Sequence, residues 1–150
     1  MRGKCLCERI AFEIVGGVPT LYQCHCSLCR KQGGAASNTA AIIANDQFRW
    51  LSGEEHISSW TSATGFRSDF CSHCGSPVPN PLGDKPYYWV PAGLLDGEHA
   101  LKVVAHLYVG SKASWDVVAS PGSQYETMPE LSELLRLDAD IEPLPDQTHS

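Results

Sequence analysis

The segment Cys24-His25-Cys26-Ser27-Leu28-Cys29 carries three thiols in close succession, and two further cysteine clusters flank it in the chain. The earlier cluster is Cys5-Leu6-Cys7, and the later one is Cys71-Ser72-His73-Cys74. These clusters contain all seven cysteines of the chain. Cysteines separated by one or two residues can direct both sulfurs at a single ion, and such pairs are typical of zinc sites. The spacing therefore predicts metal binding.

The seven thiols divide most simply into four and three, because zinc takes four protein ligands in structural sites and three in catalytic sites. The C-x₂-C pair of the last cluster needs two more ligands, and the first cluster can supply them without using the central one. The predicted closed site consists of Cys5, Cys7, Cys71 and Cys74, and the predicted open, catalytic site consists of Cys24, Cys26 and Cys29. The alternative joins the central trio to one distant thiol and leaves an odd number elsewhere, so we favour the first division.

Two other uses of the thiols are less consistent with the sequence than zinc binding. Four cysteines can also hold an iron–sulfur cluster, but the spacing here matches neither of the common ferredoxin patterns. A disulfide framework fits poorly, because an odd number of cysteines in such tight clusters does not pair simply. Closely spaced C-x₂-C and C-x-C ligands suit tetrahedral zinc best. The sequence thus predicts two zinc ions, one structural and one catalytic.

Length and charge exclude several classes of function. The 150 residues are enough for one domain with a substantial core, and 43% hydrophobic and 19% charged residues are typical of a globular protein. The formal net charge of −6 disfavours nucleic acids and anionic membranes as partners. The N-terminal residues lack the pattern of a secretory signal, and no apolar stretch is long enough to span a membrane. We therefore expect a cytoplasmic location, where clustered thiols are more often metal ligands than disulfides.

Hydrophobic periodicity predicts a mainly β chain. Ile10, Phe12 and Ile14 alternate with less apolar residues, as in a half-buried strand. Further strands are predicted at residues 21–24, 36–43, 48–51, 56–60, 66–70, 87–91 and 103–109. Ser27 is a candidate cap for a short helical turn that ends at Gly33 and Gly34. Residues 76–83 contain three prolines, which predicts a stiff loop rather than a central strand.

The end of the chain differs in character from the rest. Residues 129–137 are predicted to form a short amphipathic helix with leucines on one face, and residues 138–150 form an acidic tail that we expect to fray or to lie on the surface. We expect a metal-binding domain at residues 1–120. The extension at residues 121–150 is expected to belong to the same single domain.

Several charged and aromatic residues are weaker candidates. Arg30 and Lys31 directly follow the central cluster and can offset its negative charge or hold an anionic substrate, although a solvated pair is the alternative. His25 and His73 lie between cysteines and are expected to support the sites or to be exposed rather than to bind metal. The candidates without an assigned catalytic role are Arg67, expected in a surface ion pair, Lys112 and His106, and Trp50, Trp60, Trp89 and Trp115, expected to pack in the core or at its rim.

With these motifs in place, the sequence resembles the family of glutathione-dependent formaldehyde-activating enzymes, which also contains the centromere protein V relatives. The resemblance runs from about Gly3 to Trp115. Its motifs are the three cysteine clusters in order, the segments 65–70 and 92–96, and residues 106–115, which include Lys112-Ala113-Ser114-Trp115. Two residues depart from the family pattern: Glu8 replaces the usual glycine, and Lys4 replaces the common serine.

The resemblance implies a β-rich fold called Mss4-like or β-tent. It also implies a structural zinc on Cys5, Cys7, Cys71 and Cys74 and a catalytic zinc on Cys24, Cys26 and Cys29. The implied activity is that of a carbon–sulfur lyase that forms S-(hydroxymethyl)glutathione from a small-molecule thiol, glutathione, and a small aldehyde, formaldehyde. The alternatives are a glutathione- or small-thiol-binding module with little turnover, and a structural or interaction protein on an Mss4-like scaffold. Acidic charge without a basic extension disfavours a chromatin role.

Overall fold

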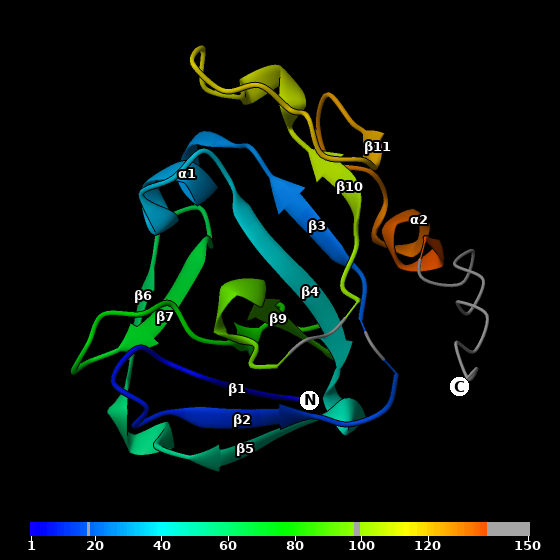
Figure 1. The fold of residues 1–150 in the computed structure, drawn as a ribbon. Helices are drawn as coiled ribbons and strands as arrows, with labels where there is room; N and C mark the ends of the chain where they lie inside the picture. Colours follow the sequence, from blue (N-terminus) through cyan, green and yellow to red (C-terminus); the bar gives the residue numbers. More distant parts are fainter. Residues whose placement is uncertain (18, 98–99, 138–150) are drawn as a thin grey trace.

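The structure is a computed structural model that describes residues 1–17, 19–97 and 100–137 (Figure 1). Its strands form three sheets, ordered β11-β10-β3-β4-β9-β8, β1-β2-β5 and β6-β7. The expected mainly β fold with short helical turns is confirmed, and the arrangement is consistent with the Mss4-like fold. No helix among the described residues is both long and apolar enough to cross a membrane.

The elements follow the sequence prediction closely. The six-stranded sheet contains β3 (Leu21–Cys24), β4 (Asn38–Ala44), β8 (Asn80–Pro81), β9 (Tyr87–Pro91), β10 (Val103–Leu107) and β11 (Ser123–Gln124). The smaller sheets contain β1 (Arg2–Lys4), β2 (Ala11–Ile14) and β5 (Phe48–Ser52), and β6 (Ile57–Thr61) and β7 (Arg67–Cys71). The helices are α1 (Ser27–Gly33) and α2 (Leu131–Arg136), and the 3₁₀ turns are η1 (Asn45–Gln47), η2 (Glu54–His56), η3 (Ala92–Leu94) and η4 (Val109–Ser111).

Three hydrophobic clusters hold the sheets together. The largest joins the β1-β2-β5 sheet to the six-stranded sheet through Phe12, Ile14, Leu21, Ala41, Ile43, Phe48 and Val90. The alternation of β2 places Phe12 and Ile14 inside, as predicted, because successive strand residues point to opposite faces. The second cluster contains Cys5 and Cys71, and the third contains Cys24. Each cysteine set therefore lies in a separate cluster of the interior.

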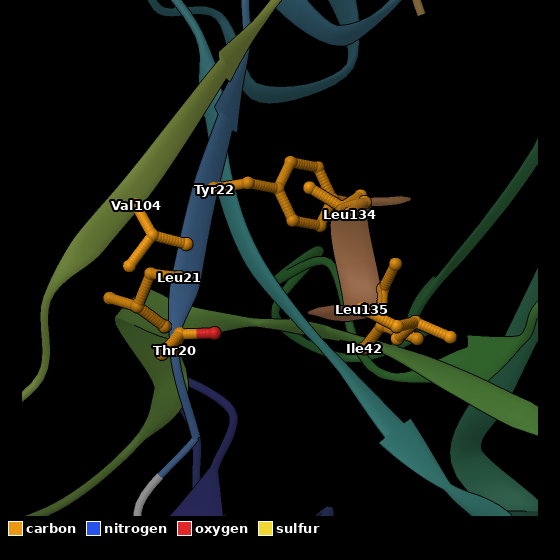
Figure 2. Close-up of a pocket in the computed structure, with 7 residues that line it drawn as sticks. All are labelled: Thr20, Leu21, Tyr22, Ile42, Val104, Leu134 and Leu135. Carbon is orange, nitrogen blue, oxygen red and sulfur yellow. The ribbon is translucent and has the colours of Figure 1, made fainter. Parts of the chain in front are cut away.

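The C-terminal helix α2 covers the third cluster. Leu134 is 6% exposed and packs in the same cluster as Cys24, Ala105 and Leu107. Figure 2 shows Leu134 against Tyr22 of β3 at a small pocket beneath this helix. The pocket has a volume of about 10 Å³, which holds about one water molecule and no substrate. The predicted helix is thus confirmed, while the predicted acidic tail lies outside the described residues.

The structure differs in detail from the sequence prediction at four points. The strand β1 was not predicted, because its residues are Arg2, Gly3 and Lys4 and carry no apolar pattern. The proline loop contains no central strand, as predicted, but it does contribute the two-residue strand β8 at the edge of its sheet, where proline is tolerated. The strand predicted to reach residue 109 ends at Leu107, because Tyr108 adopts a left-handed conformation with φ of 56°.

The fourth correction concerns the tryptophans that were expected to pack. Trp50 does so: it contacts the rings of Phe12, Phe48 and Tyr88. Trp60 and Trp115, however, are 59% and 71% exposed. Trp60 lies on β6 of the two-stranded β6-β7 sheet, at an exposed position of that strand.

Candidate metal centres

The four cysteines predicted for the closed site lie together in the structure. Their sulfurs are all within 4.8 Å of one another, although the pairs are far apart in the chain. The Sγ–Sγ distance is 3.6 Å between Cys5 and Cys7 and 3.7 Å between Cys7 and Cys71. Sulfurs bound tetrahedrally to zinc at about 2.3 Å would be about 3.8 Å apart. All seven cysteines are free thiols, so these contacts are not disulfides.

Two tight turns deliver these sulfurs. In the first turn, Glu8 N–H donates to the carbonyl of Cys5 at 3.0 Å, and Glu8 has φ of 68°, in the left-handed region that favours glycine. The family pattern has glycine here, so the backbone conformation is kept although the residue differs. Glu8 also forms an ion pair of 2.7 Å with Lys4. The two departures from the family pattern are therefore direct partners on the surface.

Ser76 connects the second turn to the first. Its hydroxyl oxygen accepts a hydrogen bond of 3.0 Å from Leu6 N–H and lies 3.3 Å from Cys74 Sγ. Leu6 lies between Cys5 and Cys7, so one hydroxyl contacts both halves of the site. Hydroxyl and amide groups around metal ligands orient them and tune their basicity.

The thiols of this site have strongly different proton affinities. Burial raises the pKa of Cys5 to about 11. Burial also opposes ionisation of Cys74, but hydrogen bonds from Ser76, from Cys7 N–H and from Cys71 outweigh it and lower its pKa to about 5. Four thiolates at such short distances repel one another strongly without a cation. A bound dication removes this conflict, and metal binding would release the remaining protons.

The β7 strand that leads to Cys71 is held by a buried acid. Asp69 is 3% exposed, and its carboxylate accepts two hydrogen bonds of 2.9 Å from Arg67, one from Nε and one from Nη2. Ser59 of β6 donates a further hydrogen bond to Asp69. The prediction that Arg67 serves an ion pair is confirmed, and the fork geometry fixes the strand next to the cysteine turn.

The predicted open site is formed by a single short segment. Cys24 ends β3, Cys26 precedes α1, and Cys29 lies in the first turn of that helix. The three sulfurs are within 4.8 Å of one another, and no fourth cysteine, histidine or carboxylate of the described part of the chain joins them. The N-cap of α1 is Cys26 rather than the predicted Ser27: its Sγ accepts a hydrogen bond of 3.3 Å from Cys29 N–H. The helix start thus orients one sulfur of the trio.

Sulfur contacts also set the ionisation of this trio. A hydrogen bond from the Cys29 thiol lowers the pKa of Cys24 to about 6, and the same contact, together with burial, raises the pKa of Cys29. One thiol therefore ionises easily while another keeps its proton. Such a set accepts a divalent ion readily, because the ion replaces the shared protons.

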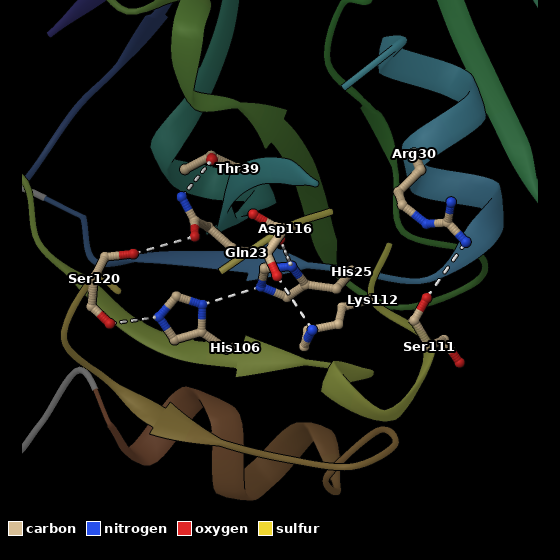
Figure 3. Close-up of polar contacts among 9 residues, drawn as sticks. All are labelled: Gln23, His25, Arg30, Thr39, His106, Ser111, Lys112, Asp116 and Ser120. Carbon is tan, nitrogen blue, oxygen red and sulfur yellow. Dashed lines mark hydrogen bonds and ion pairs between the residues drawn. The ribbon is translucent and has the colours of Figure 1, made fainter. Parts of the chain in front are cut away.

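His25 connects the trio to the segment after β10 (Figure 3). Its side chain is almost fully buried, and its Nε2 lies 3.1 Å from Nδ1 of His106, which is also fully buried. His106 Nε2 lies 3.1 Å and 3.2 Å from the carbonyl oxygens of Ser120 and Pro121. Carbonyls only accept, so in the neutral ring this nitrogen carries the proton and Nδ1 accepts a hydrogen bond from His25. Sequence reasoning assigned His106 no role, and its spacing carries no signal for this contact.

The remaining charged candidates differ in burial and in their contacts. Arg30 is half-buried, and its Nη2 donates a hydrogen bond of 3.3 Å to the carbonyl of Ser111, while Lys31 is exposed. His73 is exposed beside the closed site, as expected. The His25 ring lies 3.5 Å from a carboxylate oxygen of Asp116, which the sequence analysis had not singled out. Burial lowers the pKa of His25.

Comparison with known proteins agrees with these features. Residues 1–111 match the family described as glutathione-dependent formaldehyde-activating enzyme. A protein of Halomonas elongata that carries this name as a provisional assignment is 29% identical over 84 residues, which are 52% of this chain and 54% of the relative. The chain therefore aligns with about half the length of that relative.

A solved structure resembles the fold as well. The crystal structure of a Rhodobacter sphaeroides protein superposes with a TM-score of 0.54 at 25% sequence identity and covers 67% of this chain and 92% of that protein. Since the family pattern extends over residues 1–111 and includes all seven cysteines, the chain belongs to the family of glutathione-dependent formaldehyde-activating enzymes.

Proposed function

We propose that the protein binds zinc at both cysteine sets and catalyses the addition of a thiol, glutathione, to formaldehyde at the open one. The product would be S-(hydroxymethyl)glutathione, which makes the protein a carbon–sulfur lyase in the reverse direction. The observation that carries the proposal is the trio of sulfurs with no fourth protein ligand among the described residues. Three ligands and an open position are typical of catalytic zinc.

The donor sets fit zinc better than the alternatives. An iron–sulfur cluster binds its four cysteines on two or four iron atoms, so its four sulfurs spread farther than the sulfurs of one tetrahedral ion. Here all four sulfurs of the closed set lie within 4.8 Å of one another, and the Sγ–Sγ distances of 3.6 and 3.7 Å match the edge of a zinc tetrahedron. Thiolates are soft ligands, which suit zinc and disfavour magnesium or calcium.

The reaction itself needs no redox partner. The thiol sulfur forms a bond to the carbonyl carbon of formaldehyde, the carbon–oxygen π pair moves to oxygen, and the thiol proton ends on that oxygen. Zinc at the trio would supply a Lewis-acid position that favours the thiolate form of the substrate. The chain's own contribution is orientation: Arg30 binds the carbonyl of Ser111 and His25 binds His106 of β10, and these hydrogen bonds hold the segment that carries the three sulfurs against the sheet.

We further propose that residues 121–150 belong to the same domain as residues 1–120. The strand β11 pairs with β10 in the main sheet, and Leu134 of α2 packs in the cluster that contains Cys24. The extension would then help to hold the open site.

The test is the rate of S-(hydroxymethyl)glutathione formation with the zinc-loaded protein, measured by NMR against the uncatalysed background. We expect a rate at least about tenfold above background that falls to background in Cys26→Ser, while the neighbouring Ser27→Ala keeps the wild-type rate. A rate equal to background at every protein concentration would contradict the enzyme proposal. Glutathione binding without acceleration would then indicate the alternative, a thiol-binding module.

A further inference from the structure

The buried His106 lies on the face of the six-stranded sheet that the trio of sulfurs does not occupy. In the pairing of β3 with β10, Leu107 pairs with Cys24 and His106 pairs with Gln23. Leu107 packs in one cluster with the three cysteines of the trio, so His106, the preceding residue of the strand, points to the other face. Its hydrogen bond with the ring of His25 therefore holds the cysteine segment from the far side of the sheet.

His25 is held at two points by neighbouring residues of β10. Its backbone N–H donates a hydrogen bond of 2.9 Å to the carbonyl of Leu107, and its ring Nε2 lies 3.1 Å from Nδ1 of His106. Its other ring nitrogen lies 3.5 Å from a carboxylate oxygen of Asp116, which is longer than an ordinary hydrogen bond. Because His25 lies between the first two cysteines of the trio, fixing its backbone and its ring also fixes the directions of both neighbouring side chains.

A later segment of the chain holds His106 in turn (Figure 3). The carbonyl oxygens of Ser120 and Pro121 lie 3.1 and 3.2 Å from Nε2 of His106. Carbonyls only accept, so they keep the proton on this nitrogen and leave Nδ1 as the acceptor for His25. Ser120 also donates a hydrogen bond of 3.4 Å to the side-chain oxygen of Gln23, the residue paired with His106. The segment thus sets the tautomer on which the position of the His25 ring depends.

Gly122 allows this segment to approach β10 closely. Its φ is 129°, a conformation that residues with a side chain rarely adopt. A Cβ atom at this position would lie 2.8 Å from the carbonyl carbon of Val104 and 3.0 Å from the amide nitrogen of Ala105. Both are backbone atoms of a strand that is paired on each side, so they cannot move aside. A side chain at position 122 would therefore push the two carbonyls away from His106.

We propose that residues 120–122 position the open metal site from the opposite face of the sheet, through His106 and then His25. This inference rests on the proposed binding of zinc at the trio and names the residues that tune it. His106 is a positioning residue, because it acts on the sulfurs through the ring of His25. The segment 120–122 lies outside residues 1–111, which match the family, so this control of the site belongs to the extension of this chain.

Zinc affinity tests the role of His106 independently of catalysis. Competition with a chromophoric chelator gives the affinity of each zinc, and the zinc that is absent in Cys26→Ser is that of the open set. His106→Phe keeps a ring but removes the acceptor for His25, so we expect the zinc affinity of the open set to fall about 10- to 100-fold, with the closed set unchanged. His106→Asn restores an acceptor near the position of Nδ1 and should recover most of the loss. Ile43→Ala, which alters a buried residue of a different cluster, controls for lost stability and should leave both affinities unchanged.

Gly122→Ala tests the segment itself, because it leaves both histidines in place. We expect it to lower the zinc affinity of the open set about tenfold or more. The matched control is Gly83→Ala: Gly83 also has a positive φ, 57°, but a Cβ atom there meets nothing within 4 Å, so strain is added away from the site. Cobalt(II) bound at the open set in place of zinc reports the geometry, and its visible absorption bands should shift in His106→Phe and Gly122→Ala but not in the controls.

The outcomes separate this proposal from the enzymatic one. Equal open-set affinities in the wild type and in both variants would overturn it, as would an equal loss in Ile43→Ala or a wild type that binds no zinc at the trio. A loss in His106→Phe without one in Gly122→Ala would overturn the role of the segment. If both variants weaken zinc binding as expected but the wild type does not accelerate the formaldehyde reaction, the positioning role stands and the enzymatic proposal fails.

Discussion

Both cysteine sets consist of thiols, but one set joins distant parts of the chain and the other comes from a single local segment. The closed set joins turns that are 64 residues apart at Cys7 and Cys71, and two of its four cysteines, Cys5 and Cys71, are at most 2% exposed. The open set comes from one short segment at the junction of β3 and α1. Exposure does not distinguish the two sets, because Cys7 and Cys74 are partly exposed, as are Cys26 and Cys29.

Because the two sets draw their cysteines from different ranges of the chain, a metal would stabilise the fold at the closed set and leave room for a substrate at the open set. A metal that joins distant turns holds segments that would otherwise diffuse apart, so its binding energy becomes folding energy. A metal held by one local segment adds little to the fold, because the strand end and the helix turn are positioned by the sheet and by hydrogen bonds. The open set can therefore leave a coordination position for a substrate without endangering the structure.

The largest expected effect comes from breaking the closed set. Cys71→Ser removes a buried thiol of the closed set, and a structural zinc bound there would supply an apparent binding free energy of about 10 kcal/mol or more. We expect the variant to lose cooperative thermal unfolding as followed by circular dichroism. Ser72→Ala, an exposed neighbour, is the control and should unfold as the wild type does. A variant at position 71 with an unchanged transition would show that this metal is not needed for folding.

The open set should respond differently. In Cys26→Ser we expect the zinc content of protein prepared without chelator to fall from two ions to one, with the fold retained. Serine is itself a favoured N-cap, so α1 keeps its cap while the metal loses a ligand. Metal analysis by mass spectrometry together with circular dichroism measures both. Unfolding of this variant would mean that the trio, too, is structural, and one zinc in the wild type would contradict the two-ion proposal.

A milder change probes the hydroxyl that connects the turns of the closed set. Ser76→Ala removes the contacts with Leu6 N–H and Cys74 Sγ. Loss of such supporting groups typically lowers metal affinity about 10- to 100-fold. Competition with a chromophoric chelator should show this loss at one zinc, while the second zinc keeps its wild-type affinity. An equal loss at both sites would contradict the separation of the two sets.

The smallest expected effect separates the role of Cys26 as the N-cap of α1 from its proposed role as a metal ligand. Cys26→Ala and Cys26→Ser both abolish the third sulfur, but only serine can accept the hydrogen bond from Cys29 N–H. We expect the alanine variant to be less stable than the serine variant by about 1 kcal/mol, or roughly 3 °C in melting temperature. Equal melting temperatures would show that Cys26 does not stabilise the start of α1.

Local patterns in the sequence predicted most of the fold and the grouping of the sulfurs. Strand β2 and helix α2 follow from the periodicity of their own residues, and the trio follows from its spacing. His106 could not be found in this way, because its partner His25 is 81 residues away and the two meet only through the parallel pairing of β3 and β10. The contact of Asp116 with His25 also depends on this long-range pairing. Strand β1 escaped prediction because backbone pairing with β2, rather than apolar side chains, defines it.

The long separation between the halves of the closed set has a consequence during synthesis. A ribosome releases the trio of sulfurs well before Cys71 and Cys74 emerge, because domains are made from the N-terminus at about 5 to 20 residues per second. For some seconds the nascent chain offers Cys5 and Cys7 without their partners, next to a complete trio. Under the proposed function, the order of translation would give the open set the first opportunity to bind metal, and the turn at Cys71 and Cys74 would join the N-terminal segment afterwards.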